Sequence, residues 1–276
     1  MIAKNQRYLI AIDLDGTLLT DDKRITAKTK AYLQKLDKLG HIIVLASGRA
    51  ERSTSRFAAL LNLKNPVVSY NGVLTLSDHD ENFKTRMATY PLENIKAIIR
   101  SIGIDNLENI MCETPECVWL QKEDKQLSAF FDHNEVKVIY GDILQNLDVS
   151  PITLIFKFKE HTEEMKNQAR KIIRQYPNYD VRFWWDSDYG EIFYQNVTKA
   201  DGIASIAEYY KIPSERIIAF GDAENDIHML SRAHYGFAMK NANLVTKKHA
   251  AYYTCRDNNH DGIIFELAKL LKIPID

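Results

Sequence analysis

The sequence predicts an α/β protein in which a parallel, three-layer core carries a smaller, inserted α+β domain. Three observations predict this. Strands and helices alternate over the first seventy residues, the alternation returns near the C-terminal end, and the segment between has a pattern of its own. The chain has 276 residues, which is near the upper limit for a single hydrophobic core, so we expect a main domain with a second, smaller one.

The first part of the chain has the pattern of parallel strand–helix units. Residues 8–12 form a continuous apolar run, which is typical of a strand covered on both faces. The apolar residues that follow have a helical period, which Thr26 can open as an N-cap and Gly40 can close. In chain order we expect a strand at 8–12, a helix at 25–39, a strand at 42–46, a helix at 53–63 and a strand at 66–70. Right-handed crossovers follow by default.

The last part of the chain repeats the alternation. We expect a helix at 201–210, a strand at 217–220, a short helix at 225–231 and a strand at 235–238. The two ends of the chain would then share one sheet, so the core domain is predicted to span residues 1–80 and 190–276.

The middle segment, residues 81–189, is predicted to be an α+β cap domain. Its expected elements are helices at 92–102, 125–133 and 163–176 and strands at 110–112, 118–120, 152–158, 181–185 and 191–194. The run 182–189 is the most distinctive candidate for substrate choice, since its aromatic rings could stack on a sugar or a base. Alternation along a strand favours a plainer role, in which Phe183 and Trp185 pack the sheet against its helices and Trp184 lies on the opposite face.

Composition excludes several classes of partner. Lys and Arg number 36 against 37 Asp and Glu, so no global field draws the protein to nucleic acid or to an anionic membrane. No stretch approaches the ~20 apolar residues of a membrane span. Three cysteines without C-x-x-C spacing suit a reducing compartment, and a zinc site built from Cys112, Cys117 and His133 would lack a fourth ligand. We therefore expect a cytoplasmic monomer or small homo-oligomer that binds a small molecule.

Two carboxylates, Asp13 and Asp15, follow the first predicted strand directly, and Gly16 permits a sharp turn there. Ligands commonly bind in the crevice outside the carboxyl ends of parallel strands. A D-x-D-G sequence alone is equally typical of a polar turn. The functional interpretation is favoured because three further polar segments also follow apolar runs, namely Ser47-Gly48-Arg49, Lys199 and Gly221-Asp222. All four segments are improbable together by chance.

These residue types suit the chemistry of a phosphoryl group. Catalysis of its transfer is mostly positioning and electrostatic stabilisation. Asp13 and Asp222, with a backbone carbonyl, would form the oxygen site that Mg²⁺ prefers, and the metal would offset repulsion between a carboxylate nucleophile and phosphate. Lys199 suits both phosphate and Asp13, while the Ser47 hydroxyl and the Gly48 amide at a helix start could bind phosphate oxygens.

The residues at this point resemble the four motifs of the haloacid dehalogenase superfamily. The motifs are, in matching order, residues 13–18, Ser47, Lys199 and residues 221–226. The arrangement looks like the Cof-type sugar-phosphate phosphatase branch, because Tyr70-Asn71-Gly72, Lys199 with Asp201-Gly202, residues 239–242 and Asp261-Gly262 also fit the pattern of that branch. One departure is Ala223, where that branch commonly carries glycine.

The resemblance implies a Rossmann-like core with a Cof-type cap, and it assigns roles to individual residues. Asp13 would attack phosphorus, while Asp15 would protonate the leaving oxygen and later deprotonate the attacking water. Mg²⁺ would be bound by Asp13, the Asp15 carbonyl and Asp222, with Asp226 as a further or indirect ligand. The phosphate-binding residues would be Ser47, Gly48, Lys199, Asn225, Asn71 and Gly72. A helix starting at Asp222 would place residues 222, 225 and 226 on one face.

The predicted function is magnesium-dependent hydrolysis of small phosphate monoesters, such as sugar phosphates, through an aspartyl-phosphate intermediate. Two alternatives stay open on the sequence. An intramolecular phosphotransferase, such as a hexose-phosphate mutase, would use the same chemistry while excluding water. A non-catalytic phosphometabolite sensor would need neither Asp13 nor Asp15. A dehalogenase fits less well, because carbon–halogen chemistry does not need a magnesium set.

Overall fold

The computed structural model describes residues 6–160, 162–184 and 188–275, which divide into two compact units. One unit combines the chain up to Arg86 with the chain from Thr198 onwards, and the other spans Met87–Val197. The sequence placed these boundaries near residues 80 and 190. The second boundary lies later because the strand Tyr189–Tyr194 pairs within the sheet of the second unit.

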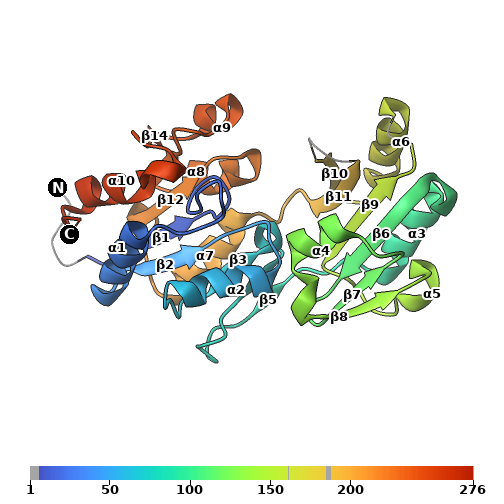
Figure 1. The fold of residues 1–276 in the computed structure, drawn as a ribbon, viewed down its shortest axis with the longest axis horizontal. Coiled ribbons are helices and arrows are strands. Elements are labelled where there is room, and N and C mark those ends of the chain that lie inside the picture. The colour runs from blue at the N-terminus through green and yellow to red at the C-terminus, as the bar shows by residue number, and fades with distance from the viewer. Residues whose placement is uncertain (1–5, 161, 185–187, 276) are drawn as a thin grey trace. The chain divides into compact units, whose positions relative to one another are not determined.

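The first unit contains a five-stranded parallel sheet in the order β14-β13-β12-β1-β2 (Figure 1). The strands are β1 (Leu9–Ile12), β2 (Ile42–Leu45), β12 (Ile217–Gly221), β13 (Tyr235–Ala238) and β14 (Tyr252–Tyr253). A bridge between Ala46 and Val68 continues the sheet to β3 (Val67–Ser69), which forms a smaller sheet with β4 (Leu74–Leu76) and β5 (Arg86–Met87). The predicted strands of the core are therefore present.

Helices flank this sheet and bury its apolar side chains in one core cluster. They are α1 (Ala27–Lys38), α2 (Glu51–Leu60), α7 (Lys199–Tyr209), α8 (Ile227–Arg232) and α10 (Gly262–Leu271). A further helix, α9 (Leu244–His249), adds no residue to this cluster, and its Leu244 and Val245 are exposed. As predicted, the Thr26 hydroxyl caps α1 by accepting a hydrogen bond from the amide of Thr29 at 3.0 Å, and Gly40 follows the helix with a φ of +89°. The local sequence signals thus specify where this helix begins and ends.

The second unit is an α+β domain with a six-stranded sheet in the order β10-β11-β9-β6-β7-β8. Its strands are β6 (Leu107–Glu113), β7 (Cys117–Leu120), β8 (Lys137–Tyr140), β9 (Thr153–Phe158), β10 (Tyr179–Phe183) and β11 (Tyr189–Tyr194). Its helices are α3 (Leu92–Ile102), α4 (Lys125–Phe131), α5 (Ile143–Asn146) and α6 (Glu163–Ile173). All pairings are antiparallel except β7 with β8.

The aromatic run of the second unit follows strand alternation. Phe183 is partly buried and packs against Phe156 and Phe158 of the core cluster, as the plainer interpretation predicted. The next residue, Trp184, contacts Phe130 instead, with ring centroids 5.2 Å apart. Trp185 lies outside the described residues, so its predicted packing is not tested. No helix among the described parts of the chain is long and apolar enough to cross a membrane.

Candidate active site

Three predicted motif segments meet at one edge of the parallel sheet. Asp13 follows β1, Ser47 follows Ala46 at the end of β2, and Asp222 follows β12. These strands are neighbours in register, with Ile12 beside both Leu45 and Phe220. The amide of Asp13 also continues the ladder by donating to the carbonyl of Phe220 at 3.1 Å. Parallel pairing therefore brings together side chains that are more than 200 residues apart in the chain.

Lys199 reaches this edge from a helix rather than from a strand. It is the first residue of α7, where the Asp201 carboxylate accepts hydrogen bonds from the amide and hydroxyl of Thr198. The Lys199 side chain is 0% exposed, and its Nζ lies 2.6 Å from Oδ1 of Asp13 and 2.6 Å from Oδ1 of Asp226. Burial alone would lower the pKa of Lys199, but the two carboxylates raise it, so the ammonium stays charged.

Asp222 is held against the loop that follows β1. Its Oδ1 accepts a hydrogen bond from the Thr17 hydroxyl at 2.9 Å. Gly16 has a φ of +73°, and a Cβ atom at this position would overlap Oδ2 of Asp222. Only glycine therefore lets the Asp15–Gly16 backbone approach the carboxylate so closely. Burial, followed by the charge of Asp226, raises the pKa of Asp222 to about 6.

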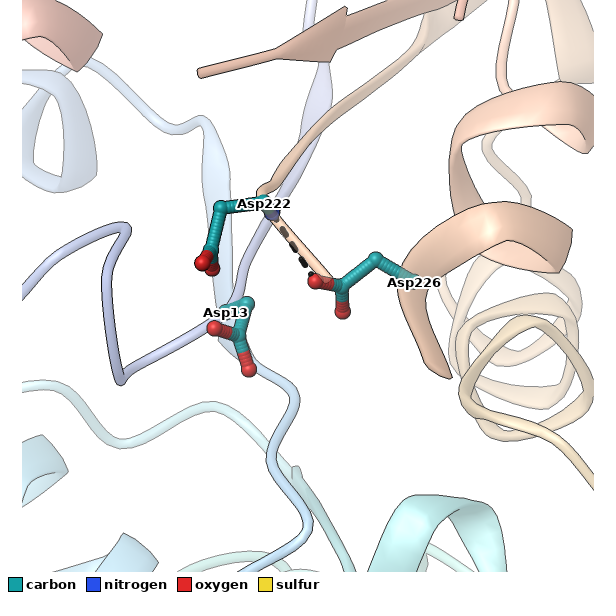
Figure 2. A group of neighbouring side chains, drawn as sticks. All are labelled: Asp13, Asp222 and Asp226. Carbon is teal, nitrogen blue, oxygen red and sulfur yellow. Dashed lines mark hydrogen bonds between the residues drawn. The ribbon is translucent and has the colours of Figure 1, made fainter. Parts of the chain in front are cut away.

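The Asp222 segment corrects the helical prediction made from spacing. Asp222 and Ala223 precede the helix, which begins as a single 3₁₀ turn at Glu224–Asp226 and continues as α8. The Asp226 side chain points back towards Asp222, and its Oδ2 accepts a hydrogen bond from the amide of Asp222 at 3.0 Å (Figure 2). The same oxygen accepts a second hydrogen bond from the amide of Ala223 at 3.1 Å. The prediction of one helical face was wrong, but the turn still brings Asp226 beside Asp222.

The three carboxylates Asp13, Asp222 and Asp226 offer oxygen atoms that all lie within 4.8 Å of one another. Burial, and then the charge of Asp226, raise the pKa of Asp13 well above its usual range. When all three are ionised, one ammonium leaves two negative charges uncompensated, which is the charge of one divalent cation. An all-oxygen donor set is also the one that Mg²⁺ prefers. The residues present therefore fit such an ion.

Asp226 is less suited than the other two to direct coordination. Both of its oxygens already have partners, since Oδ1 bonds Lys199 and Oδ2 bonds two backbone amides. Its geometry is that of a group that fixes Lys199 and the Asp222 loop in place. This matches the indirect role that the family resemblance also allowed.

Three of the predicted phosphate-binding residues, Ser47, Asn71 and Asn225, are linked to one another by hydrogen bonds. The carbonyl of Ser47 accepts a hydrogen bond from the amide of Asn71 at 2.9 Å, and Asn71 Oδ1 accepts one from Asn225 Nδ2 at 2.8 Å. Gly48 packs against the Asn71 amide group, and Gly72 packs so tightly on the Thr198 carbonyl that a Cβ would overlap it. Helix α2 begins three residues after Gly48, so this amide precedes the helix rather than starting it.

Asp15 has two cationic partners, one of which the sequence did not indicate. Its carboxylate is bound by Arg49 through Nε at 2.6 Å and Nη2 at 2.7 Å. Lys23 Nζ adds a third contact at 2.7 Å. Burial alone would raise the pKa of Asp15, but these two cations lower it to about 2. Arg49 was identified from the sequence as part of the Ser47-Gly48-Arg49 segment but was assigned no role, and no sequence pattern indicated Lys23.

Comparison with known proteins decides the family. A family model described as haloacid dehalogenase-like hydrolase matches residues 10–267. The chain belongs to this family. It is 34% identical over 261 residues to the 5-amino-6-(5-phospho-D-ribitylamino)uracil phosphatase YitU of Bacillus subtilis, covering 93% of this chain and 94% of that protein. It is 26% identical to the Escherichia coli phosphatase YbjI, which carries the same substrate name, with 96% of each chain covered.

The solved structures agree with the fold. A haloacid dehalogenase-like hydrolase from Bacteroides thetaiotaomicron superimposes with a TM-score of 0.81 at 23% identity, covering 96% of this chain and all of that one. The predicted fold class is therefore confirmed. Because the curated relatives are phosphatases, this member of the family is a phosphoric monoester hydrolase. The comparisons favour neither the mutase nor the sensor alternative.

Proposed function

We propose that this haloacid dehalogenase-like hydrolase is a magnesium-dependent phosphatase that forms an aspartyl-phosphate on Asp13. The observation that carries the proposal is the fully buried Lys199, which bridges Asp13 and Asp226 at the strand ends beside Asp222. A buried ammonium fixed on the carboxylate can hold it in one orientation and attract a phosphoryl group to it. The approach of phosphate to a carboxylate needs that positive charge.

The proposed reaction has two halves. An oxygen of Asp13 forms a bond to phosphorus as the ester P–O bond breaks, and Asp15 donates a proton to the departing oxygen. Because Arg49 and Lys23 lower the pKa of Asp15 to about 2, this step starts from the minor population of the protein in which Asp15 carries the proton. Water then attacks phosphorus, Asp15 takes its proton, and the Asp13–phosphorus bond breaks to release inorganic phosphate. Asp15 thereby returns to its starting state.

The divalent ion would be held by Asp13, Asp222 and the Asp15 carbonyl, with Asp226 fixing the surrounding groups. When bound, Mg²⁺ supplies positive charge that offsets the repulsion between phosphate and carboxylate. The overlap that any Cβ at Gly16 would have with Asp222 supports this set, because it shows the Asp15–Gly16 backbone pressed against that carboxylate.

Ser47, Gly48, Asn71 and Asn225 are the proposed contacts for the phosphate oxygens. The Ser47–Asn71–Asn225 hydrogen-bond chain fixes three of them relative to one another. Preorganised donors of this kind stabilise developing charge without reorganising during the reaction. We assign the choice of substrate to the second unit, which is the predicted cap domain. Trp184 and the neighbouring Phe130 are the candidate residues for this role.

The first candidate substrate is 5-amino-6-(5-phospho-D-ribitylamino)uracil. Three curated relatives carry this name, and their matches cover 92–96% of the present chain. Other small sugar phosphates are the next candidates. We also propose that the protein works in the cytoplasm, because the cysteines Cys112, Cys117 and Cys255 are free.

Phosphate release tests this function. The purified protein is assayed on the ribitylaminouracil phosphate, sugar phosphates, nucleotides and pyridoxal phosphate, with Mg²⁺ and with a chelator. Release should require Mg²⁺ and should disappear in Asp13→Asn, while Asp22→Asn in the exposed turn nearby serves as the matched control. Full activity of Asp13→Asn, or release that is unaffected by the chelator, would contradict the proposal.

A further inference from the structure

Most of the hydrogen-bonding positions of the Asp15 carboxylate are occupied by two cationic side chains. An ionised carboxylate has about four lone-pair positions for hydrogen bonds. Among the described residues, Oδ1 accepts from Lys23 Nζ and Arg49 Nη2, and Oδ2 accepts from Arg49 Nε. Three positions are therefore filled, which leaves one lone pair on Oδ2.

Arg49 is itself held in a defined position. Its side chain is only 17% exposed, and its Nη1 donates to the Ser53 hydroxyl at 3.3 Å on the first turns of α2. Its guanidinium lies 5.5 Å from the centre of the Phe57 ring. The backbone amide of Arg49 donates to the Ser47 hydroxyl at 3.1 Å, which ties it to the proposed phosphate-binding segment. A planar guanidinium held in this way can fix the plane of a carboxylate.

Lys23 comes from a turn that is tied down from a distant part of the chain. Lys23 has a φ of +59°, a strained conformation for a residue with a side chain. The turn is held by Asp21, whose carboxylate accepts from Asn258 at 3.0 Å and from Asn259 at 2.9 Å. Asn258 also donates to the carbonyl of Leu19 at 2.9 Å. This anchoring keeps the Lys23 ammonium directed at Asp15.

We propose that Arg49 and Lys23 are positioning residues that form a clamp on Asp15 and leave Oδ2 as its proton-exchanging atom. The inference rests on the proposed phosphatase reaction. With the carboxylate plane fixed by Arg49, the proton leaves Asp15 Oδ2 for the departing ester oxygen and later returns to Oδ2 from water. The clamp thereby sets the position from which the leaving group is protonated.

The test compares substrates with different leaving groups. Protonation matters little when the leaving group is stable as an anion, as in p-nitrophenyl phosphate, and matters greatly for an alkyl or sugar phosphate. The value of kcat/KM, which reports formation of the phosphoenzyme, is measured for both kinds with saturating Mg²⁺. The variants are Arg49→Gln, Arg49→Lys and the exposed Lys23→Met. The matched controls are Arg56→Gln on α2 and Arg24→Gln in the Lys23 turn.

General acid catalysis contributes roughly 10²–10⁴-fold, so Arg49→Gln should lower kcat/KM for the sugar phosphate by about tenfold to a hundredfold. It should change the p-nitrophenyl value less than about threefold. Arg49→Lys should recover part of the loss, and Lys23→Met should show a smaller loss with the same substrate dependence. Both controls should match the wild type.

Three results would overturn the clamp. Equal losses on both substrates would mean that Arg49 is merely structural. A gain on the sugar phosphate would mean that the cations withhold the proton of Asp15. Unchanged values in Arg49→Gln and Lys23→Met would mean that neither acts on Asp15. Failure of the proposed function is distinguishable, because the wild type would then release no phosphate or Asp13→Asn would retain activity.

Discussion

Replacement of Lys199 by methionine should destabilise the protein as well as inactivate it. The side chain is 0% exposed, and it bridges Asp13 and Asp226, which are 5% and 0% exposed. Methionine keeps much of the volume but leaves two buried carboxylates without their cation. Removing one partner of a buried ion pair typically costs about 3–5 kcal/mol. We expect a decrease of that size in the free energy of unfolding at pH 8 without Mg²⁺.

The loss should depend on pH with a definite sign. Burial already raises the pKa of Asp13, and loss of the ammonium raises it further, so Asp13 binds its proton more tightly in the folded state than in the unfolded chain. Protonation of Asp13 at low pH removes part of the uncompensated charge. The deficit relative to the wild type should therefore shrink as the pH falls from 8 to 5.

Urea unfolding at both pH values measures this effect, with Lys28→Met on the exposed surface of α1 as the matched control. The control should unfold like the wild type at both pH values. A Lys199→Met protein that is as stable as the wild type at pH 8, or that shows the same deficit at pH 5, would refute the reasoning. Retained phosphatase activity in this variant would refute the role of Lys199 in catalysis.

Two further predictions concern the metal and the loop after β1. The pKa of Asp222 is raised from 3.8 to about 6, so the free energy of unfolding of the metal-free protein should fall by ~3 kcal/mol as the pH rises through this range. Saturating Mg²⁺ should remove this loss. Thermal melts from pH 4 to 7.5 with and without Mg²⁺ measure the effect, and identical pH profiles would contradict it. Gly16→Ala should lower the free energy of unfolding by about 1–3 kcal/mol because of its φ of +73°, and it should weaken Mg²⁺ binding because the new Cβ overlaps Asp222. Titration calorimetry measures the Mg²⁺ affinity, and Gly40→Ala, which has open space around its Cβ, is the control for backbone strain. Unchanged Mg²⁺ affinity in Gly16→Ala would count against the site.

The sequence was sufficient where a local pattern and parallel pairing decide the outcome. Apolar runs located β1, β2 and β12, and the carboxyl ends of neighbouring parallel strands necessarily place Asp13, Ser47 and Asp222 at one edge. The N-cap at Thr26 was predictable for the same local reason.

The sequence was not sufficient where long side chains cross between segments. Lys23 reaches Asp15 because Asn258 and Asn259, more than 230 residues away, hold its turn. Asp226 accepts backbone amides because the chain makes a 3₁₀ turn before α8, and the four-residue spacing was compatible with a helix as well. The predicted boundary at residue 189 cut off the strand expected at 191–194, although the sequence pattern had assigned that strand to the second unit; the pairing of β11 with β9 and β10 shows that it belongs there.

Trapping the covalent intermediate is the most direct test of the central claim. The protein is mixed with substrate and Mg²⁺ for a single turnover and quenched in acid, and the peptides are then examined by mass spectrometry. A phosphoryl group should be found on Asp13 in the wild type and be missing from the Asp13→Asn protein. Turnover without phosphorylation of Asp13, or with the phosphoryl group on another residue, would contradict the aspartyl-phosphate mechanism.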